Sequence, residues 1–288
     1  GQNAERGVQN AAGGPILVII PSGSSVLVFG YTLLGHYKDP CDNQTMTRRD
    51  ASSLHKGHQR AETLRSLAIV PFWSCPFTVT LETRRIACDR GGRRLFEDLS
   101  FALAPGDALL VQGPNGAGKT SLMRQIAGLL PLAAGNVSVA GAEADTPVAE
   151  LCHYVGHLNG VKASLSVREN LNFWTDYLRA DESGGDVNAA LGVFGLTPIA
   201  DISAGYLSAG QKRKLALARL LACPRPIWLL DEPSVSLDVA SVERLRQAIE
   251  SHGKAGGIAI VSTHVPLGGA FTHTLDLYTV DAAKEPTP

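Results

Sequence analysis

The stretch Asp107-Ala-Leu-Leu-Val-Gln-Gly113-Pro-Asn-Gly-Ala-Gly-Lys119-Thr120 decides the fold of this chain. Its first six residues form a short and mostly apolar run, which is typical of a buried strand. A glycine-rich turn follows, and the residues from 119 to 130 predict a helix that Pro131 ends. A buried strand, a tight turn and a helix in this order predict an α/β domain.

The turn itself fits the phosphate-cradling pattern G-x-x-x-x-G-K-[ST]. Its glycines allow backbone N–H groups to surround phosphate oxygens, and the following helix adds its positive N-terminal end. Lys119 is expected to reach the β- and γ-phosphates of a nucleotide, and the Thr120 hydroxyl to hold Mg²⁺. The predicted nucleotide-binding residues here are Gly113, Pro114, Asn115, Gly116, Ala117, Gly118, Lys119, Thr120 and Ser121.

A second strand, Ile227-Trp-Leu-Leu-Asp231-Glu232, ends in two carboxylates. Buried carboxylates are costly without a cation, so Asp231 is predicted to be a magnesium ligand. Glu232 stands one residue further on and is predicted to be the general base that polarises an attacking water. His264 closes the next core strand, where we expect it to contact the γ-phosphate.

Strands and helices alternate from residue 78 onward, and a helical insert interrupts them. Strands are predicted at 78–84, 99–103, 136–140, 152–156 and 258–262, and helices at 167–178, 188–194, 208–222 and 239–252.

Composition limits the classes of partner. The formal net charge is −1, so no basic footprint favours nucleic acid. Five cysteines without CxxC spacing favour a reducing compartment over a disulfide framework. His36, Cys41, His55 and His58 match no common zinc spacing, and we interpret them as polar loop residues.

Residues 1–77 differ from the rest of the chain. They hold polar and glycine-rich patches around an apolar stretch, 15–35, that Pro21 and its neighbouring serines and glycine interrupt. The interruption argues against a spanning helix of about 20 apolar residues. We interpret 1–77 as a disordered extension or as the product of a start codon placed too far upstream.

The sequence Leu207-Ser-Ala-Gly-Gln211 resembles the signature motif of ABC ATPases, usually written LSGGQ. The resemblance implies a P-loop NTPase of ABC type, with a mixed sheet core and a helical subdomain at about 158–212. It also implies that 78–288 form an ABC nucleotide-binding domain that works as two copies. By this resemblance Ser208, Gly210 and Gln211 are expected to bind the ATP held by the opposite subunit. The segment Ser236-Leu-Asp238 resembles the D-loop of the same family.

Three segments, 160–174, 207–221 and 228–238, are similar to the ATP-binding subunit of cytochrome c maturation haem exporters of proteobacteria. This resemblance implies an ATPase that uses ATP and Mg²⁺ to drive a separate integral membrane subunit. It also implies peripheral attachment to the cytoplasmic face of the bacterial inner membrane, and haem delivery to a periplasmic chaperone for c-type cytochromes.

Two positions depart from the usual ABC pattern. His157 stands where glutamine is usual, as is common in the haem-exporter family, and is expected to bond water or phosphate rather than metal. The stretch before the P-loop, 88–92, lacks the aromatic residue that stacks on adenine. Arg90 either stacks its guanidinium on the base or is a solvated charge.

Two alternative functions remain open from the sequence. One is the ATPase subunit of an ABC transporter with another substrate, whose nucleotide site would look the same. The other is a soluble ABC ATPase acting on nucleic acid or ribosomes, which the single cassette and the near-neutral charge disfavour.

Overall fold

The computed structural model describes residues 77–143, 145–178, 186–264, 267–269 and 271–277. The predictions for 1–76, for the apolar stretch within it and for His36, Cys41, His55 and His58 therefore lie outside the described residues. The chain divides into two units, and all described residues belong to the second of them.

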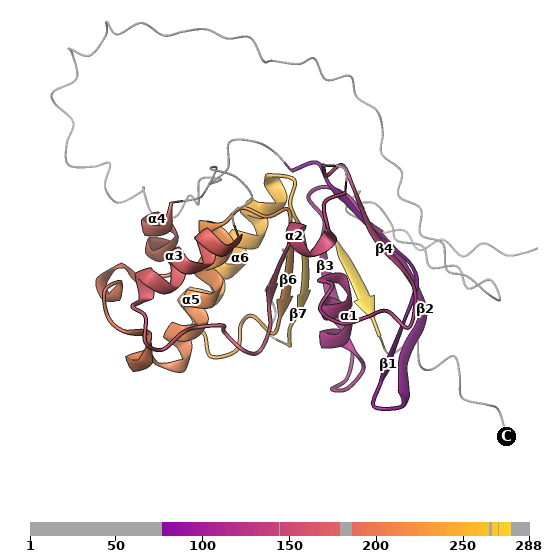
Figure 1. Cartoon of the computed structure of the whole chain (residues 1–288), viewed down its shortest axis with the longest axis horizontal. Coiled ribbons are helices and arrows are strands. Elements are labelled where there is room, and N and C mark those ends of the chain that lie inside the picture. Colours follow the sequence, from indigo (N-terminus) through magenta and orange to yellow (C-terminus); the bar gives the residue numbers. More distant parts are fainter. Residues whose placement is uncertain (1–76, 144, 179–185, 265–266, 270, 278–288) are drawn as a thin grey trace, which may run out of the picture. The chain divides into compact units, whose positions relative to one another are not determined.

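A five-stranded parallel sheet forms the centre of the described part, in the order β5-β6-β7-β3-β8 (Figure 1). Side chains alternate between its two faces, as the pleat of a strand requires. Leu229 and Ile260 belong to one hydrophobic cluster, whereas Trp228 and Val261 belong to the other. The strands are β3 (Ala108–Gln112), β5 (Cys152–Val155), β6 (Ile227–Asp231), β7 (Ile258–Ser262) and β8 (His273–Asp276).

A three-stranded antiparallel sheet, β2-β1-β4, covers one face of this arrangement. Its strands are β1 (Thr80–Arg90), β2 (Arg93–Leu103) and β4 (Ala134–Ala140), and α1 (Lys119–Ile126) lies between the two sheets in Figure 1. Buried Leu81, Phe96, Leu122 and Met123 share one core cluster with Leu229. The mixed sheet core is thus realised as two sheets, one parallel and one antiparallel.

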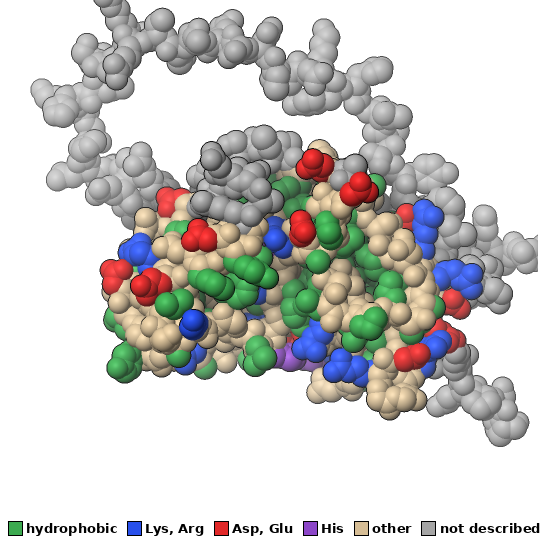
Figure 2. All heavy atoms as spheres, in the orientation of Figure 1, with side chains coloured by type: hydrophobic (Ala, Val, Ile, Leu, Met, Phe, Trp, Pro, Cys, Tyr) green, Lys and Arg blue, Asp and Glu red, His purple; other side chains and the backbone are tan. Residues whose placement is uncertain are grey.

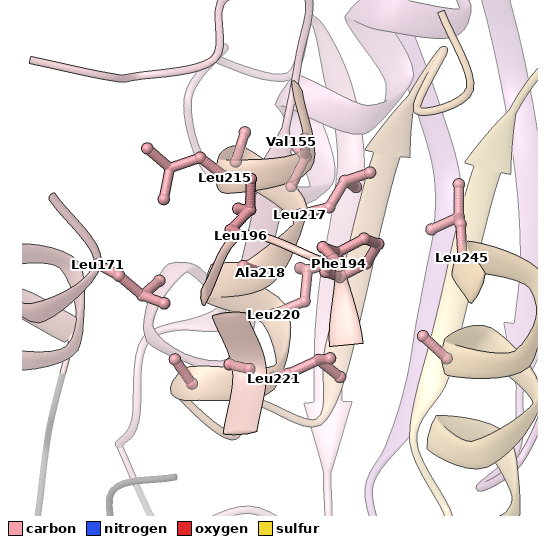
Figure 3. Close-up of a cluster of buried hydrophobic side chains, with 14 of the residues drawn as sticks. Val155, Leu171, Phe194, Leu196, Leu215, Leu217, Ala218, Leu220, Leu221 and Leu245 are labelled. Carbon is pink, nitrogen blue, oxygen red and sulfur yellow. The ribbon is translucent and has the colours of Figure 1, made fainter. Parts of the chain in front are cut away.

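Helices cover the opposite face of the parallel sheet. Figure 3 shows leucines of α5 beside Phe194, Leu196 and Leu245, and all of these side chains are buried. The layer consists of α3 (Val167–Leu178), α4 (Val187–Val193), α5 (Ala209–Ala222) and α6 (Val239–Lys254). Three further helices are short: α2 (Val148–Leu151) and the two 3-10 helices η1 (Thr197–Ile199) and η2 (Ala204–Tyr206).

Three local predictions need correction. The strand predicted at 78–84 continues to Arg90, and the strand predicted at 99–103 already begins at Arg93, because the two form one long hairpin through Gly91 and Gly92. The helix predicted to reach 130 ends at Ile126, because Gly128 adopts a left-handed conformation with φ 70°. The edge strand β8 was not predicted, since its four residues carry little apolar pattern.

Candidate functional site

The phosphate-cradling loop connects β3 to α1, as the sequence predicts. Gly118 precedes the helix with φ 103°, a conformation that side chains rarely adopt. A Cβ atom at Gly118 would also lie 3.0 Å from the Phe96 ring. The position therefore requires glycine for both backbone conformation and space. Lys119 crosses the loop, and its Nζ donates to the carbonyl oxygens of Gly113 (2.7 Å) and Pro114 (3.0 Å).

Asp231 joins the loop to the end of the central strand. The Thr120 hydroxyl donates to Asp231 Oδ2 at 2.7 Å, and the Ser262 hydroxyl donates to Oδ1 at 2.8 Å. The carboxylate is buried, with 1% of Asp231 exposed. Two hydroxyls thus fix both oxygens of one buried carboxylate, which sets its orientation toward the loop.

Glu232 follows in a strained conformation. Its φ of 50° lies in the left-handed region, and its backbone N–H donates to the Ser262 carbonyl at 3.0 Å. His264 Nε2 lies 3.3 Å from Glu232 Oε1. The turn therefore directs the Glu232 side chain away from the line of β6 and toward His264.

His157 lies near the same oxygen of Asp231 that the Thr120 hydroxyl binds. Its Nε2 is 3.8 Å from Asp231 Oδ2, and its side chain is 62% exposed. The predicted residues His157, Thr120 and Asp231 are therefore brought together from three separate segments. The exposure of the imidazole leaves it accessible to a ligand or to water.

Arg213 is a buried residue that braces the site and that the sequence analysis did not assign. It is 4% exposed, and its guanidinium donates to the carbonyl oxygens of Gly156, Asp231, Glu232 and Pro233. Burial lowers the pKa of Arg213, while the charges of Asp231 and Glu232 oppose that shift. Arg213 clamps the segment before His157 to the segment that carries the two carboxylates. Its position two residues after the signature motif was the available signal.

A cavity of about 380 Å³ opens above the loop. This volume lies within the range of about 300–1,000 Å³ that small-molecule sites usually have. The cavity is lined by Arg90, Leu95, Pro114, Asn115, Gly116, Gly118, Lys119, Thr120, Ser121, His157, Asp231 and Glu232. It therefore unites the predicted loop, carboxylates and His157 with two residues of the β1–β2 hairpin.

The signature residues lie at the start of α5 instead. Ser208 caps the helix: its hydroxyl accepts from Gln211 N at 3.2 Å, and the Gln211 side chain accepts from Ser208 N at 2.9 Å. A Cβ atom at Gly210 would lie 2.7 Å from the Ser236 carbonyl oxygen. Within one chain, Ser208, Gly210 and Gln211 thus pack beside the D-loop-like segment, and they do not line the cavity over the P-loop.

None of the helices in the described ranges is both long enough and apolar enough to cross a bilayer.

Comparisons with known structures agree with this architecture. An ATP-binding subunit of an ABC transporter superposes with a TM-score of 0.58 at 24% identity, covering 64% of this chain and 79% of that one. An ABC transporter ATP-binding protein from Pyrococcus furiosus gives 0.59 at 21% identity, covering 70% and 98%. At these identities the likeness establishes the fold, which is that of an ABC-type P-loop NTPase.

Sequence comparisons are more specific. The ABC transporter family model matches residues 96–235. The cytochrome c biogenesis ATP-binding export protein CcmA of Rhodopseudomonas palustris (strain BisB5) is 51% identical over 188 residues, which cover 65% of this chain and 93% of that protein. CcmA of Chelativorans sp. (strain BNC1) is 48% identical over 198 residues, covering 68% and 97%. With its loop, carboxylates and signature arranged as described, the chain belongs to the CcmA family of ABC transporter ATPases.

Proposed function

We propose that this chain binds and hydrolyses ATP with Mg²⁺ and so powers haem export for c-type cytochrome biogenesis through a separate membrane subunit. The observation that carries the proposal is the Thr120–Asp231 hydrogen bond beside Glu232 in a CcmA-family chain. The names of the relatives favour this role over transport of another substrate and over action on nucleic acid.

The loop offsets the charge of the triphosphate. Lys119 supplies a cation within the cavity, and the loop amides and the N-terminus of α1 add partial positive charge. Thr120 and Asp231 present the oxygen ligands that Mg²⁺ prefers, and these two residues would hold the ion. When bound, Mg²⁺ neutralises charge on the β- and γ-phosphate oxygens.

Hydrolysis requires a base near the γ-phosphate. Glu232 lines the cavity and accepts the proton of the attacking water, while His264, 3.3 Å away, holds the carboxylate in place. Water attacks the γ-phosphorus in line with the departing ADP. His157, which also lines the cavity, bonds water or phosphate beside Asp231.

Two copies of the chain complete the site. Ser208, Gly210 and Gln211 of one copy contact the γ-phosphate bound to the P-loop of the other. Exposed apolar side chains flank the D-loop-like segment, since Val235 is 56% and Val239 is 88% exposed. Apolar exposure on this scale supports a protein contact at that face.

The membrane subunit docks against α3. Phe173 and Tyr177 stack with ring centroids 6.0 Å apart and are 54% and 71% exposed. Beside them a cavity of about 600 Å³ runs between α3 and β5, and Figure 2 shows hydrophobic side chains gathered on this face. Docking there attaches the ATPase peripherally to the cytoplasmic face of the inner membrane. Residues 162–170, which precede and begin α3, pass the motion of closure to that subunit.

Co-purification with the membrane subunit, followed by ATP-dependent haem transfer to the periplasmic chaperone, tests the proposal. We expect transfer with wild-type protein and none with Glu232→Gln. Transfer that continues without ATP, or a membrane partner belonging to another transport system, would refute the haem-export role.

A further inference from the structure

The far wall of the nucleotide cavity is built by the β1–β2 hairpin. Apart from the P-loop, His157 and the two carboxylates, the residues that line the cavity are Arg90 and Leu95. Because the P-loop takes the phosphates, the base of a bound nucleotide must extend toward another part of the wall. Arg90 and Leu95 are the side chains available there.

The hairpin is anchored to the P-loop, so these two side chains have a fixed position. Arg90 pairs with Arg93 across a two-glycine turn, in which Gly91 and Gly92 have φ 59° and 74°. A Cβ atom at Gly118 would lie 3.0 Å from the Phe96 ring and 3.3 Å from Leu95 Cβ. The hairpin therefore packs against the start of α1 so closely that it leaves no room for a side chain at Gly118.

Among the described residues, Arg90 differs from the neighbouring arginines Arg84 and Arg94 in having no acidic partner. Arg94 binds Asp89 at 2.6 Å and Glu97 at 3.0 Å, and Arg84 binds Glu82 at 2.6 Å. Arg90 is exposed, and within the described ranges its guanidinium forms no ion pair or side-chain hydrogen bond. The guanidinium is therefore free to lie flat on a ligand.

The chemistry of this wall fits a purine. A planar guanidinium stacks on aromatic faces, and an aliphatic side chain packs against them. No aromatic side chain lines the cavity within the described part of the chain. Neither Arg90 stacking nor Leu95 packing reads the hydrogen-bonding edge of a base, so adenine and guanine should be held alike.

We propose that Arg90 is the nucleobase platform of this site, stacking its guanidinium on the purine of ATP or GTP with Leu95 as its apolar neighbour. The inference rests on the proposed nucleotide-binding function. It decides between the two readings that the sequence leaves open for Arg90.

Affinities for ATP and for inorganic tripolyphosphate separate stacking from simple charge attraction. Loss of one stacking partner should weaken ATP binding about tenfold in Arg90→Ala, and leave tripolyphosphate binding within about twofold. Arg90→Trp should restore ATP affinity because it supplies a planar face, whereas Arg90→Lys should not because it keeps only the charge. Arg93→Ala, on the same hairpin but outside the cavity lining, is the matched control and should bind ATP as the wild type does.

Each remaining outcome overturns the proposal. Equal losses for ATP and tripolyphosphate would make Arg90 a phosphate contact, and unchanged ATP binding would make it a solvated surface charge. A preference for ATP over GTP above about 10²-fold in kcat/KM would reveal base-edge recognition, which this wall does not supply. Failure of the wild type to bind ATP would instead count against the proposed function, so the two failures are distinguishable.

Discussion

The Thr120 hydroxyl donates a hydrogen bond of 2.7 Å to Asp231, although 111 positions separate the two residues in sequence. This bond connects the first turn of α1 to the end of β6. Ser262 holds the second oxygen of the same carboxylate from β7. These two hydrogen bonds set the orientation of the Asp231 carboxylate and keep it beside Thr120, the other predicted magnesium ligand.

Removal of the Thr120 hydroxyl should weaken the response to Mg²⁺. In Thr120→Val we expect the Mg²⁺ concentration for half-maximal ATPase activity to rise by about 10–100-fold, because both a ligand and the orientation of Asp231 are lost. Thr120→Ser keeps the hydroxyl and should remain close to the wild type. A magnesium titration of ATPase activity measures both variants. If Thr120→Val, Thr120→Ser and the wild type all needed the same Mg²⁺ concentration, Thr120 would not be a magnesium ligand.

Glu232→Gln should separate binding from hydrolysis. The amide cannot accept the proton of the attacking water, so we expect kcat to fall by about 10²–10⁴-fold while ATP affinity persists. His264→Ala should cost less, since His264 acts through Glu232 at 3.3 Å. Glu243→Gln, which removes an exposed carboxylate of α6 paired with Arg246, is the charge-matched control. Undiminished turnover in Glu232→Gln would remove Glu232 from the role of base.

Arg213→Met should destabilise the domain. The substitution keeps a buried aliphatic chain but leaves the carbonyl oxygens of Gly156, Asp231, Glu232 and Pro233 without their guanidinium donor. We expect the free energy of unfolding to fall by about 3 kcal/mol or more, since each stranded buried acceptor is costly. Urea denaturation measures this, with Lys212→Met as the control one residue earlier. A loss no larger than that of the control would mean that water replaces the guanidinium.

The location of the site could be predicted from the sequence where its motifs are local. The P-loop and the Asp231-Glu232 strand end are runs of consecutive residues, and their places in the fold follow from the flanking strands and helix. The helix predicted over 208–222 likewise forms as α5, and Ser208 caps it. Such motifs satisfy nearby backbone groups, so their spacing alone is informative.

Contacts between distant segments could not be read in this way. The division into two sheets depends on pairings such as Leu81 with Leu103 and Val139, which no local pattern specifies. Leu95 comes to line the cavity only because the β1–β2 hairpin folds back over the P-loop. Arg213 likewise joins carbonyl oxygens of segments that are distant in sequence, from Gly156 to Pro233. The early end of α1 followed from one left-handed residue, Gly128, against an apolar pattern that continued beyond it.

Two buried histidines link the stability of the fold to pH. His252 is fully buried and stacks on Trp228, with ring centroids 3.9 Å apart and planes 7° apart. His153 is 2% exposed, and its Nε2 lies 2.6 Å from the Cys223 carbonyl oxygen. Burial lowers the pKa of each histidine to about 3, and the charges of Arg219 and Arg225 add to that effect at His153.

Acid should therefore unfold this domain through these side chains. Because their pKa is lower in the folded chain than the ordinary value of 6.5, the unfolded chain binds more protons between pH 6.5 and 3. Their contribution is complete above pH 6.5 and declines below it by about 1.4 kcal/mol per pH unit for each histidine. Urea denaturation at pH 7.5, 6.0 and 5.0 measures the slope. His252→Phe keeps a ring against Trp228, and His153→Gln keeps a hydrogen-bond donor for the Cys223 carbonyl. Neither new side chain titrates, so each variant should show a shallower dependence of the free energy of unfolding on pH. An unchanged slope in the double variant would assign the acid sensitivity to other groups.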